Sequence, residues 1–249
     1  LVVFSSRLTD VKLVRPSDLR ITKQLVRIST PRTVQGLSRT GAEFPLNAIV
    51  VAFSVEAFAA YTVGRRVFQQ VTGPIARSAN VVASIVSGQD LGQKASSTSS
   101  SANLRFRIRA LALLGVTLIS ILAVLMYLSS ETLASFFGDD ETTRALSSTF
   151  VQAFAISAPA GGLARIFAGV LQGAGETMKP FLAELVGNFG MLLGITYFGG
   201  IVLGYGIIAL YVAVIAYGVG RLVLVLFWYR QEIWITDAFT RMESRDSVQ

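Results

Sequence analysis

The sequence predicts an all-α fold, a polytopic membrane helix bundle with six transmembrane helices. Of the 249 residues, 52% are hydrophobic and 15% are charged, whereas about 25% of the residues in a soluble domain are charged. The mean hydropathy is +0.58. Ala110 to Leu128 contain no charged residue, and about 20 apolar residues are enough to cross the roughly 30 Å of a bilayer's hydrocarbon core. We therefore expect the lipid bilayer to be the main partner of this chain.

The residue types also exclude several classes of function. Cys and His are absent, which removes thiol nucleophiles, imidazole bases and the common zinc ligand sets, so we expect no enzyme, no metal site and no cofactor. The glycines between Gly169 and Gly175 lack the Lys and Ser/Thr that complete a phosphate-binding loop. The net charge is +7, but basic residues of membrane proteins more often lie in cytoplasmic loops beside anionic headgroups, so we expect no nucleic acid partner.

Residues 1–33 carry seven Lys and Arg side chains. From residue 18 to residue 28 apolar side chains alternate with basic ones, and Pro16 and Ser17 precede this stretch. The pattern predicts a cytoplasmic amphipathic linker helix that lies in the membrane surface. An ordinary solvated linker is the alternative.

Residues 34–230 are predicted to form a six-helix transmembrane lobe, and residues 231–249 a cytoplasmic tail. The predicted spans are 36–58, 67–88, 108–130, 149–171, 181–203 and 206–229. The last four are strongly apolar, whereas the second is partly polar and must turn a polar stripe toward protein or water. The Ser-rich tract 95–101 predicts a loop between the second and third spans.

The Lys and Arg residues outside these spans are unevenly distributed. Fifteen lie on the side of the N-terminus, whereas Arg65, Arg66 and Arg144 lie in the opposite loops. By the positive-inside rule both termini of this multi-pass protein are cytoplasmic, which requires an even number of spans. We expect its location to be the cell membrane.

Charged side chains within the spans are the strongest functional signal, because each costs about 2.5–3.5 kcal/mol at the helix centre on insertion scales. Arg39, Glu43 and Asn47 follow one another at intervals of four, so they share one face of the first span. We predict that this face lines a cavity. The alternative is a structural salt bridge between Arg39 and Glu43.

Further polar positions occur in the later spans. Glu184 and Asn188 form a polar strip on the fifth span, although Glu184 is close enough to the inner surface to be solvated there. Arg77 and Arg165 are the cations that snorkelling explains least, whereas we expect Arg221 to snorkel to the inner surface. The predicted substrate and ion pathway therefore consists of Arg39, Glu43, Asn47, Arg77, Arg165, Glu184 and Asn188.

Two stretches resemble the multidrug and toxic compound extrusion (MATE) family. The first, residues 28–92, contains Pro31 at the start of a span, Ala59 to Tyr61 after it, and Gly-Gln-x-x-Gly at 88–92. The second, residues 165–180 (RIFAGVLQGAGETMKP), is similar to the family's loop after the tenth span, with Glu176 in place of the usual Asp.

The resemblance implies a twelve-span protein with two six-helix lobes that exports organic cations in exchange for sodium ions or protons. This chain would be the C-terminal lobe, and its partner would be a second six-helix lobe, either the missing N-terminal half or another copy. The family's cation-coordinating Glu of the seventh span corresponds to Arg39, with Glu43 one turn later, and its Asp of the tenth span corresponds to Gly161. Both ion-site carboxylates are therefore missing or displaced in this lobe.

The sequence therefore predicts a lobe of a secondary active transporter that exports drugs or organic ions by alternating access, in cation-coupled antiport with a sodium ion or a proton. The excess of positive side chains within the spans favours an anionic or zwitterionic small-molecule substrate. It leaves open a lipid or polysaccharide flippase of the same superfamily. A non-transporting membrane fragment or assembly subunit is a further alternative.

Overall fold

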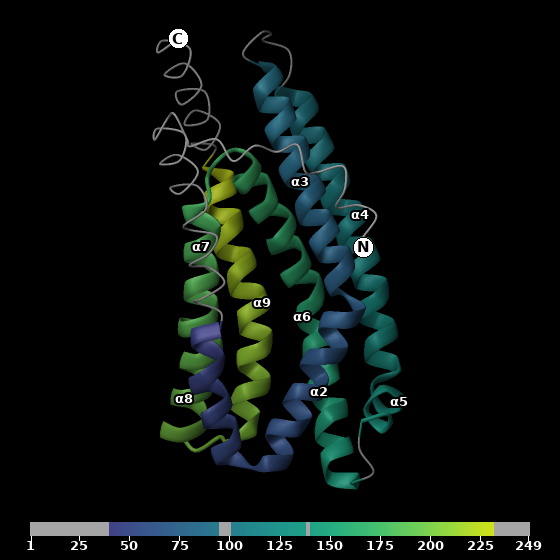
Figure 1. The fold of residues 1–249 in the computed structure, drawn as a ribbon, viewed down its shortest axis with the longest axis vertical. Coiled ribbons are helices and arrows are strands. Elements are labelled where there is room, and N and C mark those ends of the chain that lie inside the picture. The colour runs from purple at the N-terminus through teal and green to yellow at the C-terminus, as the bar shows by residue number, and fades with distance from the viewer. Residues whose placement is uncertain (1–39, 95–100, 138–139, 232–249) are drawn as a thin grey trace, which may run out of the picture.

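The computed structural model describes residues 40–94, 101–137 and 140–231, and this part of the chain contains helices and no strand. Figure 1 shows a bundle whose long helices run side by side. The elements are, in chain order, the helix Thr40–Phe53, α2 (Val55–Val71), α3 (Gly73–Lys94), α4 (Ser101–Leu128), α5 (Ser130–Ser135), α6 (Glu141–Gly173), α7 (Met178–Leu185), the π-helix η2 (Val186–Gly194), α8 (Ile195–Tyr197), the π-helix η3 (Phe198–Val202) and α9 (Ile207–Arg230). The predicted all-α membrane bundle is confirmed.

Among the described residues four helices are long and apolar enough to cross a membrane: Asn103–Leu128, Glu141–Gly173, Met178–Val202 and Ile207–Arg230. They correspond to the last four predicted spans. The first predicted span appears as Thr40–Phe53, which is apolar but shorter. The second corresponds to the more polar helices α2 and α3. The described residues therefore contain four helices of full length and apolarity, and not six. The predicted helix 1–33, Arg39, most of the Ser-rich tract and residues 232–249 lie outside the described residues.

A tight turn at Ser54 separates the first helix from α2. The Ser54 hydroxyl accepts a hydrogen bond from the backbone N–H of Ala57 at 2.9 Å, and Glu56 follows in the first turn of α2. Both features favour a new helix start. The prediction of a first span to residue 58 and of an outer loop containing Arg65 and Arg66 was therefore wrong, because both arginines lie within α2.

The chain breaks again between α2 and α3, at Thr72. The backbone N–H and the hydroxyl of Thr72 both donate to the carbonyl of Phe68, at 3.0 and 2.7 Å. Gly73 begins α3, and Pro74 cannot donate a backbone hydrogen bond to the carbonyl of Gln70. Since the usual helical ladder is interrupted here, α2 and α3 form one long passage with a break in its middle (Figure 1).

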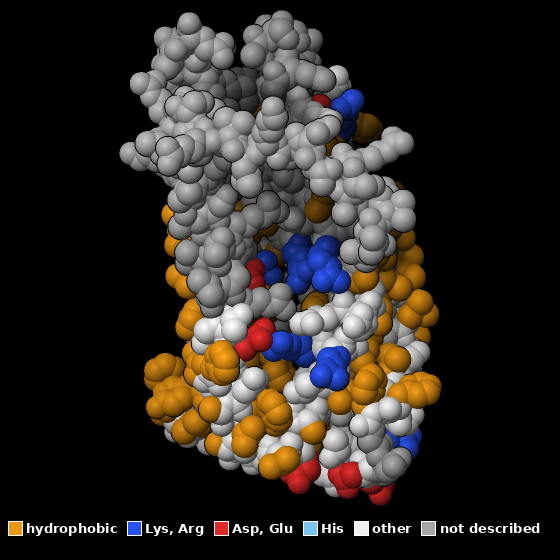
Figure 2. All heavy atoms as spheres, viewed as in Figure 1, with side chains coloured by type: hydrophobic (Ala, Val, Ile, Leu, Met, Phe, Trp, Pro, Cys, Tyr) orange, Lys and Arg blue, Asp and Glu red, His pale blue; other side chains and the backbone are white. Residues whose placement is uncertain are grey.

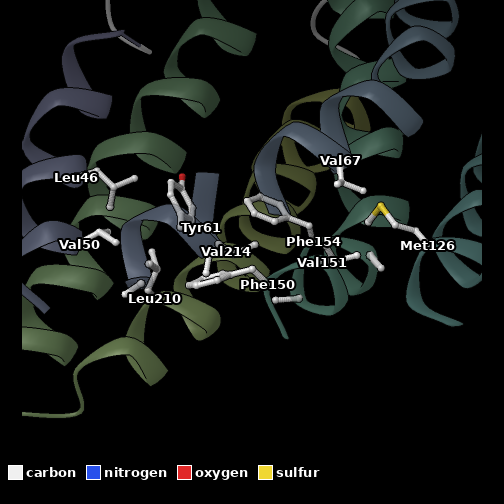
Figure 3. Close-up of a cluster of buried hydrophobic side chains, with 14 residues drawn as sticks. Leu46, Val50, Tyr61, Val67, Met126, Phe150, Val151, Phe154, Leu210 and Val214 are labelled. Carbon is white, nitrogen blue, oxygen red and sulfur yellow. The ribbon is translucent and has the colours of Figure 1, made fainter. Parts of the chain in front are cut away.

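Helix α6 is the centre of the bundle and contacts α2, α3, α4, α5 and α9. It contributes Phe150, which is fully buried and meets Tyr61 edge to face with ring centroids 5.7 Å apart. Figure 3 shows this apolar cluster, to which α2, α6 and α9 all contribute. Its labelled members are Leu46, Val50, Tyr61, Val67, Met126, Phe150, Val151, Phe154, Leu210 and Val214.

Helices α3 and α6 approach so closely that glycine is required on α6. A Cβ at Gly169 would lie 3.0 Å from Asn80 Nδ2 and would also collide with the Asn80 carbonyl oxygen, and a Cβ at Gly173 would collide with the backbone of Ser84. The Asn80 side-chain amide donates to the carbonyl of Arg165 at 2.7 Å. This crossing therefore fixes the position of Arg165 relative to α3.

Asp140 is the N-cap of α6, and its pKa provides a pH test of the helix start. The carboxylate accepts hydrogen bonds from the Thr143 backbone N–H and hydroxyl, both at 2.8 Å, and these bonds lower the pKa of Asp140 below its ordinary value of 3.8. The stabilisation is therefore present above pH of about 3.8 and is lost as the pH falls through the lower folded-state pKa. We expect Asp140→Ala to lower the thermal midpoint in detergent at neutral pH, and this difference from the wild type to shrink in acid.

Asp140→Asn is the matched control for this cap, because asparagine also accepts a capping bond but does not titrate. Its midpoint relative to Asp140→Ala should stay constant with pH. A wild-type advantage that persists unchanged at pH 2 would contradict the assignment.

Candidate functional site

Basic side chains gather in the middle of one face of the molecule. Figure 2 shows these Lys and Arg side chains with acidic ones beside them, whereas hydrophobic side chains occupy both flanks. A cavity of about 150 Å³ lies between the α2–α3 break, α4, α6 and α9. A second cavity, of about 70 Å³, is lined by the first helix, α2, α6, η2 and α9. Five residues line both cavities: Phe68, Gln69, Phe154, Arg165 and Tyr217.

The smaller cavity contains an ion pair between the first helix and α2. Arg65 Nη2 lies 3.0 Å from Glu43 Oε2, and each side chain is 29% exposed. Glu43 therefore faces a cavity, as predicted. Its partner Arg65 was predicted to lie in an outer loop. Asn47 is half-buried and is not among the residues that line either cavity.

A buried polar network joins α7 to α9. Arg221 Nη2 lies 2.6 Å from Glu184 Oε2, and both side chains are less than 10% exposed. The Tyr217 hydroxyl donates to Glu184 Oε1 at 3.0 Å and accepts from Arg221 Nη1 at 3.1 Å. Asn188 Nδ2 donates more weakly to the same carboxylate, at 3.4 Å.

This network corrects two sequence-based expectations. Arg221 does not snorkel and Glu184 is not solvated, because each charge is neutralised by the other inside the bundle. Gly187 makes the contact possible, since a Cβ there would lie 2.8 Å from Arg221 Cγ. Arg221 and Tyr217 line the larger cavity, and Asn188 and Tyr217 line the smaller one, so the network forms part of the site wall.

Arg77 and Arg165 complete the basic wall. Arg77 is an exposed residue of α3 that lines the larger cavity, and no ion pair joins it to a carboxylate of the described residues. Arg165, on α6, is half-buried and lines both cavities. Of the seven residues predicted from the sequence, the structure brings Glu43, Arg77, Arg165, Glu184 and Asn188 to this site, whereas Arg39 lies outside the described residues.

The charged groups at these cavities can form ion pairs and hydrogen bonds with a ligand. Four guanidinium groups, from Arg65, Arg77, Arg165 and Arg221, face two carboxylates within the described residues. No group of three or more acidic side chains able to hold a metal ion occurs in that part of the chain. The wall is therefore a charged surface with an excess of hydrogen-bond donors.

The loop that follows α6 has a structural role. Gly175 has a φ of 84°, and its N–H donates to the carbonyl of Gln172 while the N–H of Glu176 donates to the carbonyl of Leu171. This is the Schellman arrangement that ends a helix, and it needs a residue that tolerates positive φ. Glu176 is buried and pairs with Lys179 at 3.2 Å. The later part of the stretch 165–180 therefore ends α6. Within this stretch Arg165 lines both cavities, and residues 166–180 line neither.

Arg65, Tyr217 and Arg221 are polar site residues that were not in the predicted pathway. Ser54 followed by Glu56 is a helix-start signal, and reading it would have placed Arg65 inside a helix. No comparable signal marks Tyr217, because its role depends on how α9 packs against α7.

Comparison with solved structures finds the same fold. A MATE protein in the straight conformation matches with a TM-score of 0.75 and 17% identity, over 96% of this chain and 52% of that one. A MOP superfamily transporter from Pyrococcus furiosus, described as having a binding pocket of reverse polarity that suggests a different function, matches with a TM-score of 0.66 and 18% identity over 82% and 44%. An outward-facing multidrug resistance MATE family transporter matches with a TM-score of 0.64 and 17% identity over the same shares.

These identities establish likeness of fold, and the chain spans about half the length of the structures that it matches. Among curated protein sequences none matches the chain. The family model MatE matches residues 31–198, which include the helices from Thr40–Phe53 to α8 and most of the cavity-lining residues. The chain therefore belongs to the MatE family.

Proposed function

We propose that the chain is one lobe of a secondary active transporter that moves a small organic solute across the cell membrane by alternating access. The observation that carries this proposal is the pair of cavities lined by charged side chains within a helix bundle whose solved relatives are about twice as long. A polar cavity inside apolar helices is typical of a transport pathway. A second lobe, from a further segment or another copy, would complete its wall.

The proposed arrangement keeps residues 34–230 as the lobe, residues 1–33 as the interfacial linker and residues 231–249 as a tail, with both termini in the cytoplasm. The position of Arg65 and Arg66 within α2 supports this orientation. Of Arg65, Arg66 and Arg144, only Arg144 then lies near the outer end of the bundle. The excess of Lys and Arg on the proposed cytoplasmic side is therefore greater than the sequence predicted.

We further propose antiport coupled to a sodium ion or a proton, with Glu43 as the carboxylate that exchanges partners. Glu43 is partly exposed and lines the smaller cavity, whereas Glu184 is buried within its network with Arg221. A cation that binds Glu43 would compete with Arg65, so binding of the coupling ion would change the contact between the first helix and α2.

A specific observation bears on each of two alternative functions. The excess of guanidinium groups favours a flippase for an anionic lipid or polysaccharide intermediate. A non-transporting assembly subunit is disfavoured, because Arg165 lines both cavities instead of facing lipid.

The test is gradient-driven transport by the assembly that contains this chain, purified from membranes and reconstituted in proteoliposomes. Efflux of a panel of cationic, anionic and zwitterionic fluorescent solutes is followed under an imposed sodium or proton gradient. We expect efflux of at least one class, lost when the gradient is dissipated. Glu43→Gln should slow it at least tenfold, and Arg144→Gln, an exposed change at the start of α6, should leave it unchanged. Absence of gradient-driven movement for every solute would contradict the proposal.

A further inference from the structure

We propose that an exposed polar stripe on α2 and α3 meets an acidic surface of the second lobe, and that this lobe is a polypeptide segment other than a copy of this chain. The inference identifies the partner of the proposed transport lobe and therefore rests on that proposed function. Three features carry it: the depth of the stripe in the bundle, its charge, and the carboxylates that a second copy could offer.

The polar stripe consists of four exposed side chains on α2 and α3: Arg66, Gln70, Arg77 and Ser78. Arg66 and Gln70 are one turn apart on α2, and the exposed Pro74 continues this face across the helix break toward Arg77. Beyond Ser78 the exposed side chains of α3 become apolar: Val81, Val82 and Ile85. The stripe is therefore a polar region beside an apolar surface.

Arg77 lies near the middle of the membrane-spanning part of the bundle. The preceding residue, Ala76, belongs to the same buried cluster as Ile119 of α4, and Ile119 is nine residues from each end of the uncharged stretch Ala110 to Leu128. Nine residues of helix rise about 14 Å. This rise is longer than an arginine side chain, so Arg77 cannot reach either membrane surface by snorkelling. A charge at this depth faces protein or water and not lipid.

The polar stripe carries two positive charges and no negative one. Neither Arg66 nor Arg77 forms an ion pair with a carboxylate in the part of the chain that the structure describes. Figure 2 shows basic side chains in the middle of one face and hydrophobic side chains on both flanks, which is the distribution expected where protein covers the middle and lipid the flanks. A carboxylate of that covering protein would offset the cost of holding Arg77 at this depth.

Another copy of this chain offers no such carboxylate. Within the described residues Glu43 and Glu184, the two carboxylates near the cavities, are already engaged in ion pairs. The other described acidic residues lie near the ends of their helices or between helices: Glu56, Asp90, Glu131, Asp140, Glu141 and Glu176. The middle of the membrane stays the middle when a copy is inverted. A parallel or an antiparallel copy would therefore oppose Arg77 with another Arg77 and not with an acid.

A distinct lobe is the partner that fits this surface. It would present an Asp or Glu at the level of the break between α2 and α3, where a guanidinium and a carboxylate form charge-assisted hydrogen bonds. The side chains of Gln70 and Ser78 could add neutral hydrogen bonds on either side of that pair. Such a lobe can be a further segment of a longer polypeptide or a separate subunit.

The test is cross-linking by a membrane-permeant carbodiimide in native membranes that contain the whole assembly. Arg77→Lys keeps the charge and supplies an amine, which the reagent joins to a carboxylate paired with it. Mass spectrometry of the cross-linked peptides then identifies this carboxylate. We expect position 77 to be joined to an Asp or Glu of a peptide that does not occur in the sequence of this chain.

Two variants provide the controls. Arg65→Lys should be joined to Glu43, because Arg65 Nη2 lies 3.0 Å from Glu43 Oε2, and this product shows that the reagent reaches the interior of the bundle. Arg109→Lys makes the same substitution at an exposed position of α4 that lines neither cavity. It should give at least tenfold less cross-linked product than Arg77→Lys. Thermal unfolding checks that each variant is folded.

Charge reversal provides an independent measurement. Arg77→Glu would place like charges opposite each other in the proposed contact, so it should lower the thermal midpoint of the purified assembly more than Arg109→Glu does. Replacing the identified partner carboxylate with Lys in the Arg77→Glu background should restore the midpoint. A double variant that is no more stable than Arg77→Glu alone would contradict the pairing.

A cross-link from position 77 to an Asp or Glu of this sequence, in the same chain or in another copy, would overturn the proposal. So would the absence of a cross-link at position 77 when Arg65→Lys is joined to Glu43, since Arg77 would then face water. The transport assay remains separate from this result. An acidic partner without gradient-driven transport would contradict only the proposed function, whereas transport without the expected cross-link would contradict only the identity of the second lobe.

Discussion

Replacing Arg221 with methionine is expected to lower the free energy of unfolding by about 3–5 kcal/mol, the largest effect of any single substitution considered for this chain. The variant removes the guanidinium that pairs with the buried Glu184 carboxylate and keeps the neutral donors Tyr217 and Asn188 beside it. A buried charge that has lost its counter-ion keeps its full desolvation cost. Unfolding by a denaturing detergent, followed by circular dichroism, measures the difference.

Two further variants isolate the ion pair. The double substitution Glu184→Leu with Arg221→Met removes both charges and should recover most of the loss, since an apolar pair of similar volume is often neutral or better. Arg65→Met breaks the pair with Glu43, which is more exposed and therefore screened, so it should cost no more than about 1 kcal/mol. Equal losses in Arg221→Met and Arg65→Met would contradict the assigned burial.

Gly169→Ala is expected to destabilise the bundle by about 1–3 kcal/mol, the range for overpacking a close contact. The added methyl group would meet the backbone and side-chain amide of Asn80, so α3 and α6 must separate. The separation would also break the hydrogen bond from Asn80 to the carbonyl of Arg165. Thermal unfolding in detergent measures the loss of stability.

Gly161→Ala is a control on the same helix. No atom lies within 4 Å of a Cβ built at Gly161, so the added methyl group should act only through helix propensity, which favours alanine over glycine by up to about 1 kcal/mol. We expect the two alanine variants to change stability in opposite directions. A loss at Gly161→Ala as large as at Gly169→Ala would mean that helix flexibility, and not the close crossing, explains the effect.

The apolar helices were the part of the fold that the sequence predicted well. Long stretches without charge identify α4, α6, α7 with its π-helical continuation, and α9, because crossing hydrocarbon leaves few other solutions for the backbone. The turn at Ser54 could not be predicted from hydropathy. A hydropathy average extends over many residues, so it does not detect one hydroxyl that accepts a single hydrogen bond from the backbone N–H of Ala57.

The sequence selected several residues that lie at the cavities, but it did not predict how they pair. A charge inside an apolar span has to be offset, which was enough to select Glu43, Arg77, Arg165 and Glu184. Which cation meets which carboxylate depends on the packing of helices that are distant in sequence, as for Glu184 on α7 and Arg221 on α9. No periodicity within either helix contains that information.

The charge excess of the cavity walls has an electrical consequence. Within the described residues four guanidiniums face two carboxylates, and a unit charge that crosses the whole membrane exchanges about 2.3 kcal/mol with the field for every 100 mV of transmembrane potential. In the proposed alternating access, a lobe that reorients with an empty cavity would carry this excess through part of the field, whereas a bound solute of negative charge would cancel some of it. The reorientation of the empty lobe would then depend more steeply on voltage than that of the loaded lobe, so the membrane potential would help to set the rate of the proposed cycle.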